Sequence, residues 1–238
     1  MGKRKRSLRA GAFGLTLGVV LVGPASADPV GDETFEGSFS CLQPSASQDK
    51  APIVCQSQIN PGLPVLDLSI VWHEDTKSHQ RLIDRIDIHR AGDAELLQSI
   101  VGIDLPLPPA ADNAGIEMLD LNFDGYLDMR VAQAAGAGKN ARYRNWLWSK
   151  EDGKFVASPG LDAIASPKFN AEDEEIVSQW RSSATESGTD IYAYEGMVPV
   201  LVHREADRSG ANGSCVRTFY DRIDDQLKAT GTGACDKD

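Results

Sequence analysis

Hydrophobic and polar residues alternate in short stretches along most of the chain between residues 65 and 205. The apolar run 66–72 and the alternating segment 82–89 predict two strands with a polar turn at 74–80 between them. The reason is that a strand points successive side chains to opposite faces of a sheet. The segment 96–101 suits either a strand or a short helix. The pattern therefore places the core of the protein in this region.

Shorter alternating segments follow the proline-containing stretch 106–111. They predict strands at 115–119, 127–131, 145–149, 154–157, 176–181, 190–194 and 197–203. Asp152-Gly153 joins one pair and is a dipeptide suited to a type I′ hairpin turn, while Glu195-Gly196 joins another. Successive short antiparallel strands of this kind predict an all-β fold, either a β-propeller-like or a β-sandwich domain of short hairpins.

The loop between two of these predicted strands carries an oxygen-bearing side chain at every second position. These residues are Asp120, Asn122, Asp124 and Asp128. A hard cation such as Ca²⁺ takes about six to eight oxygen ligands, and alternate residues of a tight loop can all point inward to supply them. Gly125 stands where the chain must turn sharply, because glycine adopts positive φ without steric cost. Tyr126 would add its backbone carbonyl, so the loop predicts a calcium site.

The flanks of this loop distinguish it from an EF-hand. Val131 stands where an EF-hand places a bidentate Glu, so Asp128 would have to close the site. Strands rather than helices are predicted on both sides, which makes it an inter-strand calcium loop, similar to those of FG-GAP and integrin-type propeller blades. The alternative is an acidic surface turn that binds no metal.

The first 27 residues have the features of a secretory signal. A basic start containing Lys3 and Arg9 precedes the apolar stretch 10–23 and an A-x-A cleavage motif at Ala25-Ser26-Ala27. No cysteine follows the cleavage site directly, and no later run is long or apolar enough to span a bilayer. We expect the mature protein to begin at Asp28 and to be soluble, without a membrane partner, in the periplasm or outside the cell.

The net charge narrows the choice of partners. Removal of the signal changes the formal net charge from −11 to −16, because the signal carries five positive residues and no negative ones. So acidic a protein is a poor partner for nucleic acid or anionic membranes. The charge favours a cation or a cationic protein as partner, or serves solubility alone.

The four cysteines all lie after the signal, which fits an oxidising compartment. Of the three possible pairings, we favour Cys41 with Cys55 and Cys215 with Cys235, since each closes a short loop near one terminus. The segment 28–64 is then expected to be an N-terminal arm with one disulfide, 65–205 the β-rich core domain, and 206–238 a C-terminal tail with the other disulfide.

Three elements together resemble a family of bacterial periplasmic proteins. They are the D-x-N-x-D-G-Y-x-D loop 120–128, the glycine-rich loop and aromatic strand 136–148, and the W-R-x-x-x segment 180–184. The family comprises small propeller-like calcium-binding proteins and includes immunity proteins against lysozyme effectors delivered by type IV secretion systems. Its fold is similar to that of periplasmic inhibitors of invertebrate-type lysozyme. The resemblance covers residues 116–205.

The resemblance implies an inhibitor that inserts a loop into the active cleft of a lysozyme-like cell-wall hydrolase, with a tyrosine of the loop making much of the contact. On this chain the loop is 136–144 and the tyrosine is Tyr143, an aromatic with a hydroxyl tip of the kind that often anchors interfaces. The other expected partner-binding residues are Gly136, Gly138, Asn140 and Arg142. This loop has Ala134, Ala135, Arg142 and Asn145 where many relatives have Ser, Gly or Tyr. Alternatively, Tyr143 is an ordinary strand residue packed on the sheet, as we expect for Trp146 and Trp148.

Calcium would then be structural, because it would order the strand that leads into the 136–144 loop before binding. No enzyme activity is expected: the chain has no G-x-S-x-G elbow and no P-loop, and Lys77 stands where an H-E-x-x-H site beginning at His73 needs its second histidine. The alternative to an inhibitor is a calcium-stabilised β module that binds another envelope protein or a glycan.

Overall fold

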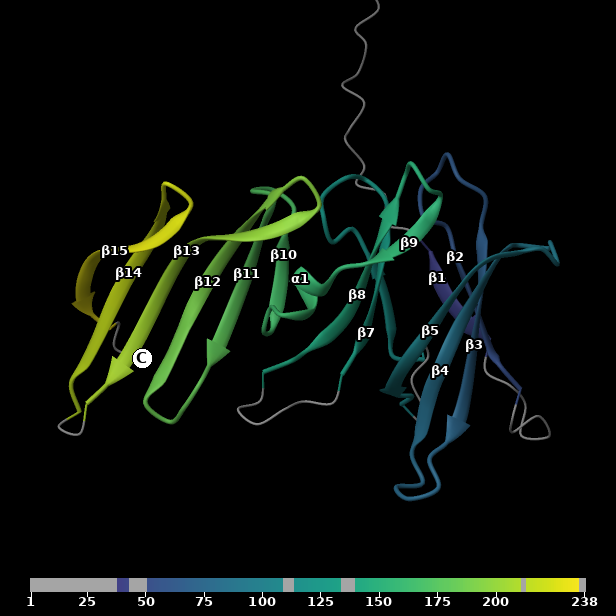
Figure 1. Cartoon of the computed structure of the whole chain (residues 1–238), viewed down its shortest axis with the longest axis horizontal. Helices are drawn as coiled ribbons and strands as arrows, with labels where there is room; N and C mark the ends of the chain where they lie inside the picture. The colour runs from purple at the N-terminus through teal and green to yellow at the C-terminus, as the bar shows by residue number, and fades with distance from the viewer. Residues whose placement is uncertain (1–37, 43–50, 109–113, 134–139, 211–212, 236–238) are drawn as a thin grey trace, which may run out of the picture. The chain divides into compact units, whose positions relative to one another are not determined.

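The computed structural model describes residues 38–42, 51–108, 114–133, 140–210 and 213–235, which belong to one compact unit, Thr34–Asp238. The strands form three antiparallel sheets, and each sheet takes its strands in chain order (Figure 1). Each strand therefore pairs with its neighbours in the sequence. The prediction of an antiparallel all-β fold is confirmed.

The first sheet has the order β1-β2-β3-β4-β5. Its strands are β1 (Phe39–Leu42), β2 (Ile53–Ser57), β3 (Leu66–Glu74), β4 (Arg81–Arg90) and β5 (Leu96–Pro106). The ambiguous segment 96–101 is thus part of a strand. Ile83, Ile86 and Ile88 are all buried although their spacing is irregular. The reason is a register shift between Ile83 and Arg85, which moves the alternation by one residue.

The second sheet has the order β6-β7-β8-β9 and lies between the other two in the chain. Its strands are β6 (Ile116–Leu119), β7 (Asp128–Ala132), β8 (Tyr143–Ser149) and β9 (Lys154–Ala157). Trp146 and Trp148 pack into a cluster shared with the first sheet, as expected of core residues. Leu147 points the other way into a second cluster, so the middle of β8 is buried on both faces.

The third sheet follows the short helix α1 (Pro159–Asp162) and has the order β10-β11-β12-β13-β14-β15. Its strands are β10 (Pro167–Asn170), β11 (Glu175–Arg181), β12 (Glu186–Glu195), β13 (Val198–Ser209), β14 (Cys215–Ile223) and β15 (Gln226–Ala234). Ile176 of β11 and Leu161 of α1 join Leu147 in the second cluster, with Phe169 and Tyr192 packed against it. These contacts join the third sheet to the second.

The propeller-like alternative is not what the structure shows. Within the described ranges the three meanders pack through two buried clusters and close neither a ring of blades nor a barrel, so the fold is sandwich-like. None of the described cluster residues comes from β13, β14 or β15. Large apolar residues of these strands, such as Val198, Val216 and Ile223, are instead exposed.

The two terminal segments also differ from the expected arm 28–64 and tail 206–238. Residues 53–57 form β2, which pairs with β3, because Ile53 and Cys55 are buried in the first cluster. Residues 215–234 form the β14–β15 hairpin on the edge of the third sheet. The core that we expected at 65–205 therefore includes strands on both sides.

Both favoured disulfide pairings are confirmed. Cys41 is bonded to Cys55 across β1 and β2, where the two residues are also register partners, and Cys215 is bonded to Cys235.

The turn between β8 and β9 differs from the type I′ expectation, because Gly153 has a positive φ of 59° but Asp152 does not. The predicted secretory signal, residues 1–27, lies outside the described residues. No helix in the described ranges is long and apolar enough to cross a membrane.

Candidate metal centre and partner-binding loop

The loop 120–128 connects β6 to β7, as the sequence predicts. Carboxylates of the loop accept hydrogen bonds from its own backbone and so fix its shape. Asp120 accepts hydrogen bonds from the backbone N–H groups of Asp124 at 3.1 Å and Gly125 at 2.8 Å. Asp124 in turn accepts one from the N–H of Tyr126 at 3.0 Å. Gly125 has a φ of 80°, which confirms the sharp turn expected at this position.

The side chain of Asn122 lies against two carboxylate oxygens. Its amide places one atom 3.2 Å from Asp120 Oδ1 and 3.3 Å from Asp124 Oδ1. If that atom is nitrogen, it donates to both carboxylates; if it is oxygen, three oxygens converge, which only a cation would stabilise. With nitrogen in that position the amide donates to both carboxylates, and turned over it would offer its oxygen beside them.

The oxygen donors of this loop are of the kind that a hard cation prefers, but they do not surround one site as a cluster of acidic groups. Within the described part of the chain no three His, Cys, Asp or Glu side chains are grouped so that they could hold a metal ion. The three converging groups here are two carboxylates and an amide. The carbonyl oxygen of Tyr126, predicted as a further ligand, accepts no hydrogen bond from any described residue.

Asp128 is the first residue of β7 and is fully buried. One of its carboxylate oxygens accepts the N–H of Leu121 at 2.8 Å, and the other accepts the N–H of Trp148 at 2.7 Å. Burial is the main cause that raises the pKa of Asp128 to about 8, and the carboxylates of Asp124 and Asp120 act in the same direction. The side chain thereby fastens the loop to β8.

The loop is also bonded to the first and third sheets. Asn60, between β2 and β3, donates its side-chain amide to the Gly125 carbonyl at 2.9 Å. The N–H of Leu127 donates to the Ile59 carbonyl at 2.8 Å. From β12, the Tyr194 hydroxyl donates to the Leu121 carbonyl at 2.9 Å. Together with Asp128, these bonds make the loop a junction of all three sheets.

One cationic side chain approaches the loop. Lys150 donates to the Asp124 carbonyl at 3.0 Å, lies 3.7 Å from the Asp124 carboxylate and sits 4.4 Å above the centre of the Tyr126 ring. Half of this side chain is exposed, so it can move aside with little loss.

The second candidate site is the loop before β8. Gly136 and Gly138 lie outside the described residues. Asn140 donates to the Arg181 carbonyl at 3.1 Å and accepts the Arg181 N–H at 3.2 Å, which docks the end of the loop on β11. Arg142 donates to the Ala163 carbonyl at 2.6 Å. Both side chains therefore serve to fix the loop, a role that sequence reasoning did not predict.

Tyr143 begins β8 and is half-buried. The guanidinium of Arg130 lies 4.1 Å from the centre of its ring, and 5.6 Å from that of Phe169. Arg130 is itself held by Glu117, to which its Nε donates at 2.7 Å. The Tyr143 hydroxyl makes no hydrogen bond to a described residue. The ring is therefore held in place while its hydroxyl is unpartnered in the described part of the chain.

Sequence reasoning missed Arg130 and Asn60. Arg130 is a charged residue in the middle of an apolar strand. Its position beside Tyr143 is visible only in the structure, where it contacts Glu117, Tyr143 and Phe169. Asn60 lies 65 residues before Gly125 in the chain, and no local pattern could join the two.

The fold is similar to that of a known bacterial protein. A structure described as a Xanthomonas type IV secretion system related protein superposes with a TM-score of 0.59 at 14% identity. The match covers 82% of this chain and 99% of that one. A protein of unknown function from Bacteroides fragilis matches with a TM-score of only 0.26 at 8% identity, over 70% of this chain and 91% of that chain, which is too low to support an argument. No protein-family model matches the chain, and no curated protein matches it. At such identities the likeness establishes a shared fold alone.

Proposed function

We propose that this protein is an exported, calcium-stabilised inhibitor or immunity protein that blocks a lysozyme-like peptidoglycan hydrolase. The observation that carries the proposal is the fold shared with a type IV secretion system related protein over nearly the whole of that protein. The motifs at 120–128, 136–148 and 180–184 support it, because they resemble those of immunity proteins against lysozyme effectors. The two disulfides suit a protein that works outside the cytoplasm.

In this proposal the loop 136–144 enters the hydrolase cleft and Tyr143 is its main contact. The ring is already held by Arg130, while Asn140 ties the end of the loop to β11 and Arg142 ties it to the end of α1. Less conformational entropy is then lost on binding than with a free loop. The Tyr143 hydroxyl, which makes no hydrogen bond to a described residue, can donate to a carboxylate of the cleft.

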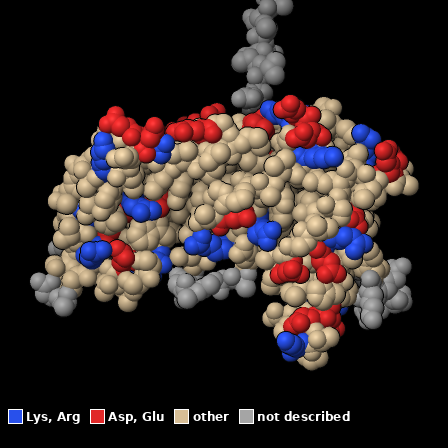
Figure 2. Space-filling model, viewed as in Figure 1, with Lys and Arg blue, Asp and Glu red and all other residues tan. Residues whose placement is uncertain are grey.

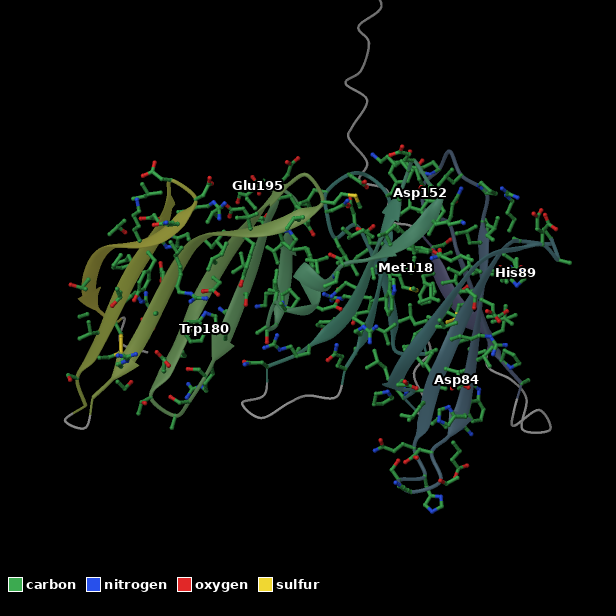
Figure 3. All side chains as sticks on the ribbon, viewed as in Figure 1. Asp84, His89, Met118, Asp152, Trp180 and Glu195 are labelled. Carbon is green, nitrogen blue, oxygen red and sulfur yellow. A yellow bond between two sulfur atoms is a disulfide. The ribbon has the colours of Figure 1, made fainter. Side chains whose placement is uncertain are left out.

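The acidic surface would assist the encounter with a basic hydrolase. Figure 2 shows acidic side chains gathered along the upper edge of the face in view, and Asp152 and Glu195 lie at that edge in Figure 3. Opposite potentials on two proteins raise the association rate more than the final affinity. The inhibition constant should therefore rise with ionic strength mainly through a slower association.

The test of inhibition is lysis of peptidoglycan by a panel of lysozymes of several types, with and without the mature protein. We expect one type to be inhibited. Tyr143→Phe should weaken the inhibition about tenfold through loss of a charge-assisted hydrogen bond, and Tyr143→Ala further, by about a hundredfold, as is common for a buried aromatic anchor. Tyr220→Phe, on β14, is the matched control and should have no effect. A broad panel without inhibition, or inhibition indifferent to Tyr143→Ala, would reject the proposal.

Calcium in this proposal is held by Asp120, Asn122, Asp124, the Tyr126 carbonyl and Asp128. We expect a Kd of about 10⁻⁴ to 10⁻³ M, the range of extracellular calcium modules. About 10 mM calcium should then stabilise the fold by roughly 1–3 kcal/mol over chelator. Asp120→Asn should abolish this gain, while Asp152→Asn, in an exposed turn, should retain it. Equal melting temperatures in calcium and chelator would refute the metal site without bearing on inhibition.

A further inference from the structure

A polar hollow of about 540 Å³ lies on the third sheet and includes no residue of the loop 120–128. Two rows of side chains cross the strands beneath it, as the register of β11, β12, β13 and β14 requires. The rows are Gln179, Thr189 and Glu205, and Arg181, Ser187, Asp207 and Arg217. Residues paired in this way point to the same face of a sheet. They form a grid of hydrogen-bonding groups across four strands.

Three of these seven side chains are bonded to one another, and the other four are not bonded to a described residue. Arg217 binds Glu205 at 3.1 Å and Asp207 at 2.7 Å, so these charges are paired with one another. The side chains of Gln179, Arg181, Ser187 and Thr189 make no hydrogen bond to any described residue. They present an amide, a guanidinium and two hydroxyl groups to a ligand.

The floor of the hollow is firmly built. Trp180, labelled in Figure 3, also lines it, and the indole N–H donates to Asp190 at 2.8 Å. Asp190 is nearly fully buried and receives both arms of the Arg204 guanidinium at 2.7 Å. A Cβ on Gly188 would lie 2.6 Å from the Trp180 ring, so this glycine is needed for the indole to lie across β12. The grid therefore rests on strands that are locked together.

We infer that this hollow binds an uncharged oligosaccharide. Its polar lining disfavours an apolar ligand, and its two cationic and two anionic side chains balance, which disfavours a phosphate or another charged group. What remains is a ligand rich in hydroxyl and amide groups, which amides, hydroxyls and guanidinium groups bind directly or through water. The volume is within the usual range for ligand sites, and the grid spans roughly 14 Å, three strand spacings, enough for a few sugar rings.

This inference goes beyond the proposed function and does not depend on it. Asn140, at the edge of the hollow, belongs to the candidate partner-binding loop, so the two sites adjoin. A sugar strand bound here would place the protein on the glycan that a cell-wall hydrolase attacks.

The experiment is calorimetric titration of the mature protein with chitotriose and with cellotriose, two neutral trisaccharides. We expect binding of at least one of them. The double variant Gln179→Ala/Thr189→Val removes two free polar groups of the grid and should weaken the binding about tenfold or more, since each lost hydrogen bond costs a few-fold in affinity. The matched control is Gln226→Ala/Thr232→Val on β15, which lies outside the hollow and should bind like the parent protein.

Two readouts keep folding and inhibition separate from sugar binding. Both double variants should keep the parent melting temperature, because the substituted side chains make no hydrogen bond to a described residue. Both should also keep any inhibition of a lysozyme, so a failure of the sugar site leaves the proposed function standing. Lack of binding by either trisaccharide at millimolar concentration, or equal binding by the two double variants, would overturn the inference.

Discussion

Replacing Asp128 by alanine removes the carboxylate through which the start of β7 binds both the β6–β7 loop, at Leu121, and β8, at Trp148. The side chain is fully buried and accepts the N–H groups of Leu121 and Trp148 at 2.8 and 2.7 Å. Without it both donors are buried and unpaired, at about 1–3 kcal/mol each. The expected loss is therefore roughly 2–6 kcal/mol, and about 4 kcal/mol lowers the melting temperature by roughly 8–16 °C for a chain of this size.

The assay is equilibrium unfolding in urea, carried out in chelator so that metal binding contributes nothing. Asp152→Ala is the matched control, because Asp152 lies in an exposed turn and accepts its hydrogen bond from the Ser149 hydroxyl. Its cost should stay near 0.5 kcal/mol, as is usual for surface substitutions. A loss for Asp128→Ala no larger than that of the control would show that the two buried N–H groups do not depend on this carboxylate.

Three further predictions concern the sheets. Gly188→Ala should cost about 1–3 kcal/mol or more in urea unfolding, because its Cβ would lie 2.2 Å from the Glu205 carbonyl, whereas Gly231→Ala, with its nearest atom at 3.8 Å, should cost far less. Cys41→Ala should lower stability by about 3 kcal/mol by opening a short loop in the unfolded chain, and reductant should then have a smaller further effect on the variant than on the parent. The bond from Arg217 holds the pKa of Asp207 below its ordinary 3.8, so this stabilisation is complete above that value and is lost as the pH falls through the lower folded-state pKa. Melting curves between about pH 2 and pH 5 should therefore show a shallower acid loss for Arg217→Gln than for the parent, and equal slopes would contradict the assignment.

Sequence patterns predicted most strands because each sheet is a meander, in which every strand pairs with the strands before and after it in the chain. Alternation within a segment, with a turn signal after it, is sufficient when the pairing partner is the next segment. The loop 120–128 was also predictable in shape, because Asp120 and Gly125 each act within a few residues of their own position.

The errors arise where burial depends on a distant element. The sequence predicts an arm at 53–57 because the surroundings are rich in proline and serine, yet Ile53 and Cys55 are buried in the first cluster. In the middle of β8, Trp146 and Trp148 face one buried cluster and Leu147 the other, so the sequence there gives no sign of an exposed side. The role of Arg130 was not predictable for the same reason. Its charge is balanced by Glu117 and lies against the rings of Tyr143 and Phe169, all of which come from other strands.

If the loop 120–128 binds a cation as proposed, its position would let the cation affect residues far from it. The loop is bonded to Asn60 in the β2–β3 connection, to Trp148 in the second sheet and to Tyr194 in the third. If the metal replaces the Asn122 amide as the partner of the Asp120 and Asp124 carboxylates, the loop becomes harder to open. The three attachments should then also become harder to break. Hydrogen exchange of Leu121, Leu127 and Trp148 amides should then slow in calcium together, while exchange in the β14–β15 hairpin, which makes no described bond to the loop, should not change. Slowing limited to residues 120–126 would show instead that the metal orders only its own loop.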